Sequence, residues 1–505
     1  MITGTLKTKI DALWQNFYNH GQSEPTDVVN QLTMLMFVKM LDDRQIEIEK
    51  RANILHQQIP DKDLIFKSGN YIDEENHINV PYQRLRWSFF KNLNGPEMMD
   101  VIRNCVFPFI RKLNAGDEGP FTKLMADITF GITSVPLLTA TVDGLSDPEI
   151  NFSDTDLMGD FYEYLLTEAN VSGQFRTPRH IIDLIVEMVA PKLEDRIIDP
   201  AMGTAGFLTE SAKYIKAKYA NDLIKVENRK FMNEEMFTGI DTDHTMARIG
   251  TMNLALHGIS KPSISMDSLL EKGNADPLYG KFDVVLANPP FSGNLDYPAT
   301  DGKILATCRT KKTELLFIAL YLKLLKVGGV AASIIPDGVL FGSDNAHKAL
   351  RQQLIENQKV LAVVSLPAGL FMPYSGVKTS FVVFQKTDCG GTDNVWMCEI
   401  TNDGFSLDAH RSPIEGSEIR SVIERYANLS LENSKTRFDD SFLVSKDDIR
   451  KMDYDLSFSK YHEIKREKIE YRPTKEIVSS ILEQHKKVQE DIEEIASCLP
   501  SKDDK

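Results

Sequence analysis

The segment Phe282–Phe291 reads Phe-Asp-Val-Val-Leu-Ala-Asn-Pro-Pro-Phe and ends in residues that could do chemistry. Its apolar run, rich in Val and Leu, predicts a buried strand of a parallel sheet. Asn-Pro-Pro predicts a loop at the carboxyl end of that strand, where open α/β sheets hold their ligands. The two prolines have a fixed φ and no N–H donor, so the loop is stiff and its carbonyls are free to accept hydrogen bonds.

These acceptors suit an amino group attached to an aromatic ring. Such a nitrogen is a poor nucleophile because its lone pair is delocalised, and two acceptors are needed to turn that pair toward an electrophile. The side-chain oxygen of Asn288 and the carbonyl of Pro289, followed by Pro290, could be those acceptors, and Phe291 offers a flat face for an extruded base. The loop fits methylation of an amino group on a nucleobase, although a plain strand-ending turn is the commoner role of Asn-Pro-Pro alone.

A glycine-rich turn upstream strengthens this interpretation. Arg196–Asp199 predicts a short strand that runs into Asp199–Leu208, Asp-Pro-Ala-Met-Gly-Thr-Ala-Gly-Phe-Leu, and then a helix. Small residues in the turn let the backbone approach a ligand closely. The turn lacks the Gly-x-Gly-x-x-Gly pattern, and its leading acid would repel a phosphate. That acid suits the ammonium group of a cofactor that carries an amino acid.

Two further features suit the nucleoside part of a cofactor, and a third suits its carboxylate. Strand Phe237–Asp241 ends in a carboxylate, Asp241, where such folds bind ribose hydroxyls, and Asp267 in strand Ser263–Ser268 could meet an adenine amino group. Before the glycine turn, Thr177 and Pro178 suit the cap and first turn of a helix over 180–189. A helix amino terminus of this kind suits a carboxylate.

Strands and helices alternate through this half of the chain, which predicts a doubly wound α/β sheet. The remaining helices are expected over 245–257, 314–326 and 346–357, with strands over 330–336 and 360–366 and an edge or antiparallel strand over 379–385. We expect an N-terminal helical domain over residues 1–150, a catalytic domain over 151–412 and a charged C-terminal region over 413–505.

The last predicted helix, Thr474 to Cys498, carries apolar residues near the three- and four-residue spacing of a helical seam. They are Ile477, Ile481, Val488, Ile492 and Ile495, with Leu499 just beyond. The seam could pack on this chain's own domain, or it could be an arm for the helices of another subunit.

Composition narrows the functional classes. Of the 505 residues, 42% are apolar and 26% are charged, which is ordinary for a soluble globular protein. No apolar run approaches the roughly 20 residues that span a bilayer, and the first residues lack the apolar core of a signal peptide. We therefore expect a cytoplasmic protein with no membrane contact. The five cysteines lack Cys-x-x-Cys spacing, so no metal site is expected. A net charge of −15 argues against tight DNA binding by this chain alone, because basic side chains that neutralise phosphates dominate such binding. The positive charge needed must be local, as in Arg84–Arg86 or Lys303–Lys312, or come from another subunit.

With these motifs in hand, the chain resembles the modification subunit of type I restriction-modification systems, a family of S-adenosylmethionine-dependent adenine-N6 DNA methyltransferases. The resemblance covers nearly the whole chain. It rests on Leu13-Trp14 with the run Leu35–Asp43, on Asp199–Leu208, on Asn288–Phe291 and on Leu366–Thr379. Ala205 stands where many adenine methyltransferases have glycine.

The resemblance implies a Rossmann-like methyltransferase sheet with an N-terminal helical domain and a C-terminal helical tail. It implies catalytic roles for Asn288, Pro289, Pro290 and Phe291. It implies that S-adenosyl-L-methionine is bound by Gln174, Phe175, Arg176, Thr177, Pro178, Arg179, Asp199, Gly203, Thr204, Ala205, Gly206, Asp241 and Asp267. The implied partners are double-stranded DNA, a specificity subunit that binds two copies of this chain, and a restriction subunit that joins for cleavage.

Two other functions stay open. The first is methylation of a protein glutamine, whose amide nitrogen poses the same chemical problem, but those enzymes usually carry Tyr at the position of Phe291 and are shorter. The second is a catalytically silent assembly subunit, which the intact Asn288–Phe291 disfavours. Cytosine N4 is also chemically open as the target, and the sequence does not reveal the DNA site.

Overall fold

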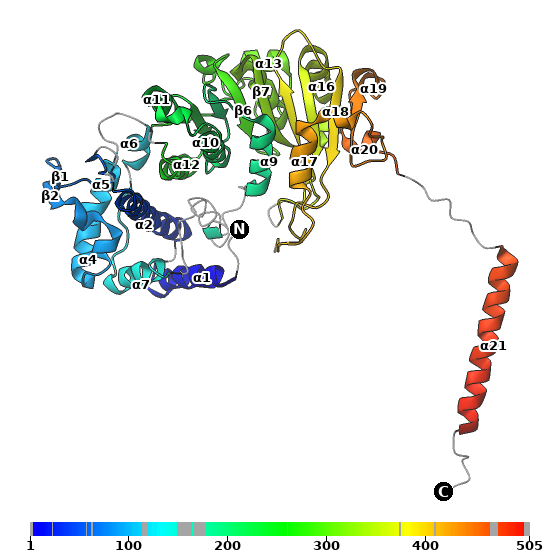
Figure 1. Cartoon of the computed structure of the whole chain (residues 1–505), viewed down its shortest axis with the longest axis horizontal. Coiled ribbons are helices and arrows are strands. Elements are labelled where there is room, and N and C mark those ends of the chain that lie inside the picture. Colours follow the sequence, from blue (N-terminus) through cyan, green and yellow to red (C-terminus); the bar gives the residue numbers. More distant parts are fainter. Residues whose placement is uncertain are drawn as a thin grey trace, which may run out of the picture. The chain divides into compact units, whose positions relative to one another are not determined.

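Figure 1 presents the computed structural model of the chain. It describes residues 4–22, 24–56, 58–61, 64–113, 120–126, 128–148, 164–165, 177–259, 261–372, 375–408, 411–464 and 473–498. The chain divides into two compact units, Met1–His462 and Glu463–Lys505.

The first unit begins with helices packed around the long helix α2 (Pro25–Ile54). Nearly every side chain from Val28 to Asp42 is buried, on all faces of the helix, as expected for an apolar helix inside a bundle. Around it lie α1 (Gly4–Asn19), β1 (Asn70–Asp73), β2 (Ile78–Pro81), η2 (Tyr82–Leu85), α3 (Trp87–Phe90), α4 (Gly95–Val101), η3 (Ile102–Val106), α5 (Phe107–Arg111), α6 (Pro120–Met125) and α7 (Val135–Leu145).

This helical part shares a hydrophobic core with one helix of the sheet region, α12 (His244–Leu256). The side chains that α12 contributes are Met246, Ile249, Met252 and Leu256. Arg44 of α2 donates to the carbonyls of Ala255 and Leu256 at 2.6 and 3.0 Å, at the carboxyl end of α12, where a cation also meets the negative end of the helix dipole. The two parts are therefore joined by both apolar and polar contacts.

Among the described residues, nine strands form one sheet in the order β11-β10-β8-β9-β7-β6-β3-β4-β5. They are β3 (Ile197–Asp199), β4 (Phe237–Asp241), β5 (Ser263–Met266), β6 (Phe282–Ala287), β7 (Leu325–Pro336), β8 (Lys359–Ser365), β9 (Thr379–Gln385), β10 (Asn394–Glu399) and β11 (Ser441–Ser445). β9 and β11 run antiparallel to their neighbours, and the other pairs are parallel.

The order of the strands reverses at β3. The chain passes from β3 to β4 and β5 on one side and then returns to β6 on the other, with Ile197 paired to Val284 and Asp199 paired to Gly239. Loops that leave the carboxyl ends of β3 and β6 therefore diverge and leave a crevice at the switch point, which is where doubly wound sheets hold ligands.

Helices cover both faces of the sheet. α9 (Arg179–Val189) and α10 (Gly206–Lys218) pack on one face with Ile197, Val284 and Leu286, and α17 (Ile419–Ala427) lies against α9 (Figure 1). α14 (Thr313–Leu324) and α16 (Asn345–Asn357) pack on the other face with Ile198 and Val285. The predicted doubly wound fold is confirmed.

The remaining elements are η4 (Asp222–Ile224), α11 (Val226–Glu234), η5 (Asp276–Leu278), α13 (Gly302–Thr307), α15 (Gly338–Phe341), α18 (Leu429–Glu432), α19 (Lys446–Lys451) and α20 (Phe458–Tyr461).

Two aspects of the sheet differ from the sequence prediction. β9 is antiparallel as predicted but is wrong as an edge strand, because it lies between β7 and β8 with its first six residues buried. Strands β10 and β11 were not predicted. β11 extends the sheet beyond residue 412, and the side chains of Trp396 in β10 and Phe442 in β11 are buried.

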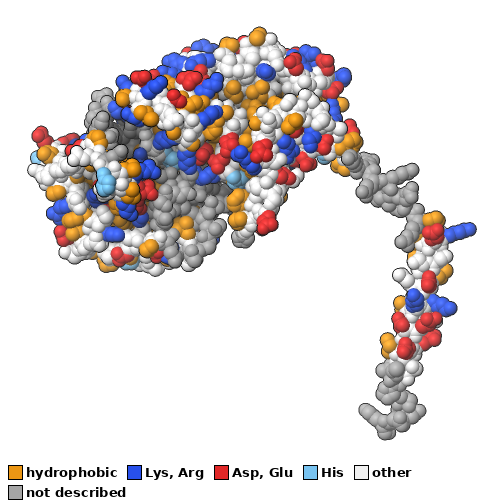
Figure 2. All heavy atoms as spheres, in the orientation of Figure 1, with side chains coloured by type: hydrophobic (Ala, Val, Ile, Leu, Met, Phe, Trp, Pro, Cys, Tyr) orange, Lys and Arg blue, Asp and Glu red, His pale blue; other side chains and the backbone are white. Residues whose placement is uncertain are grey.

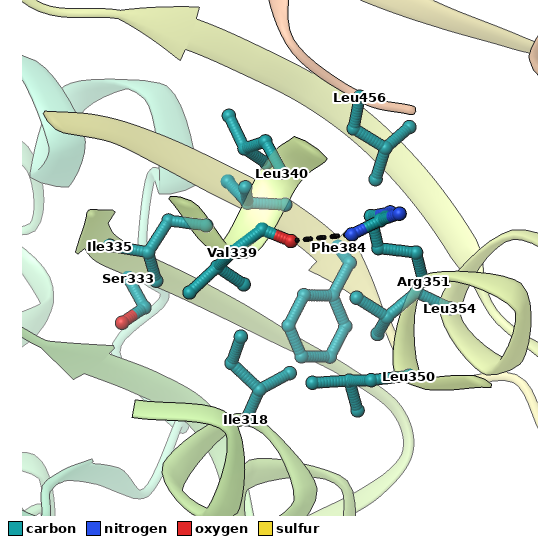
Figure 3. A pocket seen from close by; sticks show the side chains of 11 residues that line it. Ile318, Ser333, Ile335, Val339, Leu340, Leu350, Arg351, Leu354, Phe384 and Leu456 are labelled. Carbon is teal, nitrogen blue, oxygen red and sulfur yellow. Dashed lines mark hydrogen bonds between the residues drawn. The ribbon is translucent and has the colours of Figure 1, made fainter. Parts of the chain in front are cut away.

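A small apolar cavity of about 10 Å³ lies between α14, α16 and the sheet (Figure 3). It has room for at most one water molecule, so it is a packing defect and not a ligand site. Arg351, 3% exposed, borders it and donates to the carbonyls of Val339 at 3.0 Å and Tyr454 at 2.7 Å. These bonds hold the segment after β11 against the sheet's helices.

The second unit contains α21 (Thr474–Cys498), at the bounds predicted from the sequence. Its apolar side chains are exposed along the helix (Figure 2). Examples are Ile481 at 58%, Val488 at 55% and Ile495 at 63% exposure. The helix on its own leaves this apolar face uncovered.

Candidate active site

Asn288 follows directly on β6, with its side chain half-buried. Its Nδ2 donates a hydrogen bond to Oγ1 of Thr177 at 3.0 Å. Its Oδ1 is buried and has no hydrogen-bond partner among the described residues. A buried acceptor without a partner costs about 1–3 kcal/mol, so such an atom is typical of a site that receives a donor from a ligand.

The neighbouring residues shape the same loop. Pro289 is buried and Pro290 is exposed, and no described backbone N–H bonds the Pro289 carbonyl. The ring of Phe291 is half-buried and packs edge-on against Phe371, with centroids 5.3 Å apart and planes at 79°. Phe371 is 2% exposed and lies in the segment after β8. The ring of Phe291 is therefore held by a buried aromatic side chain from the segment after β8.

The glycine-rich turn after β3 has backbone dihedral angles that few residue types adopt without strain. Asp199 is 1% exposed and accepts a hydrogen bond from the N–H of Ala201 at 3.1 Å. Gly203 has φ of 50° and Ala205 has φ of 62°, both left-handed. Thr204 is held by its carbonyl, which accepts from Asn253 Nδ2 at 2.9 Å, and Gly206 begins α10. A left-handed non-glycine residue such as Ala205 stores strain of the kind found at functional sites.

Asp241, at the end of β4, ties this turn to the next strand. Its Oδ2 accepts from the N–H of Gly203 at 2.9 Å and its Oδ1 accepts from the N–H of Asp243 at 2.9 Å. Asp267 is exposed, one residue beyond the end of β5, and Asp241 pairs in register with its neighbour Met266. The structure therefore brings Asp199, Asp241 and Asp267 to one edge of the sheet.

Burial perturbs two of these carboxyl groups. It raises the pKa of Asp199 to about 8, against the hydrogen bond from Ala201, and the nearby charge of Asp241 adds to the shift. Burial also raises the pKa of Asp241, although its backbone hydrogen bonds act in the other direction. Carboxyl groups with a raised pKa at the ends of adjacent strands are typical of a site that binds a cation or hydroxyl groups.

The segment before α9 differs from its predicted role. Gln174, Phe175 and Arg176 lie outside the described residues. The N-cap position of α9 is occupied by Pro178, and no side chain caps the helix, so the prediction that Thr177 caps α9 is wrong. The hydroxyl of Thr177, a residue 5% exposed, instead accepts from Asn288, while Arg179 begins the helix.

A polar cluster that the sequence did not predict holds the start of α9. Asp403 is 2% exposed and bonds His180 Nε2 at 2.8 Å and the guanidinium of Arg411. The His180 ring also stacks on Phe405, with centroids 4.8 Å apart. Burial alone would raise the pKa of Asp403, but His180 and Arg411 hold it below its ordinary value. Partners 223 positions apart leave no spacing signal in a sequence.

Among the described residues, no three His, Cys, Asp or Glu side chains gather in a way that could hold a metal ion. Within the same residues, every helix is too short or too polar to cross a membrane.

Comparison with known families identifies this arrangement. The N-6 DNA Methylase family matches residues 153–470, which include the glycine turn, Asn288 and their strands, and the HsdM N-terminal domain matches residues 6–136. The chain belongs to the N-6 DNA Methylase family.

Relatives and solved structures agree with this assignment. The chain is 28% identical to the type I restriction enzyme EcoEI methylase subunit of Escherichia coli, over 85% of this chain and 84% of that one. It is 27% identical to the EcoKI methylase subunit of Escherichia coli K12, over 82% and 76%. The type I methyltransferase subunit of Streptococcus thermophilus has the same fold, with a TM-score of 0.65 and 20% identity over 90% and 99% of the two chains. This N-6 DNA methylase is thus a type I modification subunit and an adenine-specific DNA methyltransferase.

Proposed function

We propose that this enzyme transfers a methyl group from S-adenosyl-L-methionine to N6 of an adenine extruded from a DNA site that a separate specificity subunit selects. One observation carries the proposal. At the switch point of the sheet, Asn288 presents a buried Oδ1 that has no partner within the part of the chain that the structure describes, and the side chain is held there by its bond to Thr177. Such an acceptor suits an N–H group of the substrate, and the free carbonyl of Pro289 suits the second one.

The residues around the glycine turn fit the proposed cofactor. The left-handed backbone at Gly203 and Ala205 exposes the turn to a close ligand, and Asp199 supplies a buried carboxyl for an amino group. Asp241 and Asp267 follow the next two strands, where ribose hydroxyls and an adenine amino group would be bound. When bound, the cofactor supplies an electrophilic methyl group on a positively charged sulfur. We assign the remaining predicted contacts to Gln174–Arg179, Thr204 and Gly206.

The chain's own residues then prepare the nucleophile. Asn288 and Pro289 accept the two hydrogens of the exocyclic nitrogen, which turns its lone pair out of conjugation with the base. Phe291, fixed by Phe371, stacks on the extruded ring. The hydrogen bonds to the exocyclic nitrogen stabilise the transition state little in water and more in a site from which water is excluded.

The proposed partners follow from charge and from the uncovered helix face. A net charge of −15 disfavours tight DNA binding by the lone chain, so we assign site recognition to a specificity subunit that holds two copies of this chain through α21. A restriction subunit would join for cleavage, and methylation would protect host DNA in the cytoplasm. The proposed division is a helical domain over 1–150, a catalytic domain over 151–412 to which α17 and β11 are added from the following region, and a partner-binding helix, α21, within residues 413–505.

The test compares the lone chain with the assembled complex. Sequencing the modified bases of cells with and without this gene supplies the DNA site. At fixed salt, the lone chain should bind matched and scrambled duplexes alike, with Kd of roughly 10⁻⁴–10⁻⁶ M, and the complex should bind and methylate only the matched site. Efficient sequence-specific methylation by the lone chain would contradict the division of labour. Methylation of a protein glutamine without DNA methylation would contradict the proposal itself.

A further inference from the structure

The loop that follows the catalytic residues carries a compact group of cations around an exposed aromatic ring. Tyr297, 39% exposed, has the guanidinium carbon of Arg309 at 5.9 Å and the Nζ of Lys311 at 5.6 Å from its ring centroid. Lys312 adjoins them in sequence. We call Tyr297, Arg309, Lys311 and Lys312 the Tyr297 cluster.

This cluster is fixed directly to the catalytic loop. The N–H of Leu295 donates to the Lys311 carbonyl at 2.8 Å, and the N–H of Thr313 donates to the Gly293 carbonyl at 3.1 Å. Asn294 and Lys312 form an antiparallel bridge between these bonds. Because Gly293 is only two residues beyond Phe291, the backbone that carries the cluster continues directly from the proposed catalytic loop.

The segment between Tyr297 and Arg309 packs several of its side chains into the protein interior. Thr300 and Ile304 are fully buried, and Cys308 is 2% exposed. Asp301 caps α13 by accepting from the N–H groups of Lys303 and Ile304 at 2.7 and 3.2 Å. The cations are therefore presented from a framework that keeps its position.

The charge of this segment departs from that of the chain. Residues 302–313 contain four basic and no acidic side chains, in a protein of net charge −15. On the face shown in Figure 2, Lys and Arg are otherwise intermixed with Asp and Glu and form no broad basic surface. The segment that carries the Tyr297 cluster is therefore a local run of basic side chains next to the proposed catalytic loop.

The cations of the cluster remain available to a ligand. Arg309 is exposed and has no carboxylate partner among the described residues. Lys311 pairs with Asp296 at 2.6 Å and Lys312 with Asp344 at 3.0 Å, and all four of these side chains are between 44% and 77% exposed. Exposed ion pairs of this kind contribute little stability, so a phosphate can replace the carboxylate at small cost.

We propose that the Tyr297 cluster binds the DNA backbone phosphates that flank the extruded adenine, an inference that rests on the proposed function. Arginine and lysine on backbone phosphates position a duplex without reading its sequence. The planar guanidinium of Arg309, lying over Tyr297, is pre-oriented for two hydrogen bonds to one phosphate. The cluster holds the strand at the mouth of the pocket, and base recognition lies elsewhere.

The test uses the assembled complex with its specificity subunit and a duplex that carries its site. The double variant Arg309→Ala/Lys311→Ala should bind this duplex at least tenfold more weakly near 0.1 M salt. The slope of log affinity against log salt should become shallower by about two, because two phosphates are no longer neutralised by the protein. Calorimetry should find cofactor affinity unchanged. The charge-conserving variant Arg309→Lys/Lys311→Arg should keep the wild-type slope.

The matched control is Lys225→Ala/Lys230→Ala. These two exposed lysines lie just before and within α11, which precedes β4 and so approaches the amino edge of the sheet, opposite the site. A wild-type slope in Arg309→Ala/Lys311→Ala, or an equal change in the control, would overturn the inference and leave the proposed function standing. A wild-type complex that fails to bind its duplex would overturn both. If the double variant does not fold, Arg309→Gln carries the test, with an expected change in slope of about one.

Discussion

At the scale of single residues, the bond between Asn288 and Thr177 decides which end of the amide faces the pocket. A carboxamide offers a donor on one side and an acceptor on the other. With Nδ2 on the Thr177 hydroxyl, Oδ1 is left buried and free to accept. The sequence predicted both residues near the site. It could not predict their contact, because they are 111 positions apart and Thr177 was expected to cap a helix.

Replacing Thr177 by Val, which keeps the shape and removes the acceptor, should lower the methylation rate at saturating substrates by about tenfold or more. The full loss of one transition-state hydrogen bond, about 2.7–4 kcal/mol, is the upper limit. Thr177→Ser keeps the hydroxyl and should stay within threefold of wild type. Single-turnover methyl transfer by the assembled complex measures the effect. Equal rates for the Val and Ser variants would mean that Thr177 does not orient Asn288.

The proposed role of Asp199 predicts that cofactor binding depends on pH. Its pKa of about 8 means that the free enzyme carries a proton on this group at pH 7. Binding of an ammonium group favours the carboxylate, so affinity should rise with pH up to about 8 and protons should be released. Calorimetry at pH 7 in buffers of different ionisation enthalpy measures this release. A binding enthalpy that does not depend on the buffer would contradict the role of Asp199.

The same shift has a consequence for folding. The unfolded chain releases this proton near pH 4 and the folded chain holds it up to about pH 8, so the contribution of Asp199 to stability falls as pH rises across that window. Asp199→Asn should remove this part of the pH dependence of unfolding.

Ala205 holds a left-handed conformation that costs an L residue about 1–2 kcal/mol. Ala205→Gly should raise the free energy of unfolding by about 0.5–1 kcal/mol after the entropy of the glycine is counted. Ala205→Val should lower it, since a branched side chain fits neither the backbone angle nor a fully buried site. Urea unfolding without cofactor measures both. A less stable Ala205→Gly variant would mean that packing of the methyl group outweighs the strain.

At the scale of elements, apolar runs that end in an acid or in Asn-Pro-Pro predicted β3, β4 and β6 within one or two residues, because both faces of these strands are largely buried. β5, an edge strand with Met266 45% exposed, was predicted from the alternation of Ser with Ile and Met. The same rule failed for β10 and β11. β10 is as long as β6 but follows a turn that contains Gly390 and Gly391, and β11 lies in a charged stretch where no alternation is visible. β9 was predicted as an edge or antiparallel strand, and it is antiparallel. Its place between β7 and β8 could not be predicted, because β7 precedes β8 in the chain and the insertion of β9 between them leaves no local pattern.

The exposed apolar face of α21 predicts a partner helix. Deleting residues from Thr474 onward should leave a folded, cofactor-binding protein that no longer co-purifies with its specificity subunit. Ile481→Asp/Val488→Asp should have the same effect, and Glu483→Gln/Glu490→Gln on the polar face should not. An insoluble deletion product would favour docking of α21 on its own domain instead.

At the scale of the whole molecule, the enzyme combines a negative net charge with a substrate that is a polyanion. The proposed solution divides the work: a specificity subunit supplies affinity for the site, the Tyr297 cluster holds the backbone at the pocket, and Asn288 acts on the base. This division accounts for a proposed methyl-transfer site in the sheet region and for an apolar face on α21 that this helix does not cover by itself.

The most direct test of this account is Asn288→Ala in the assembled complex. Because the proposed role of Asn288 is to orient the nucleophile and not to hold the cofactor, calorimetry should find S-adenosylmethionine affinity unchanged. Methyl incorporation into the matched duplex should fall by about 10²–10³, the effect of removing one transition-state hydrogen bond. Methylation within threefold of wild type, with the cofactor bound normally, would contradict the central claim.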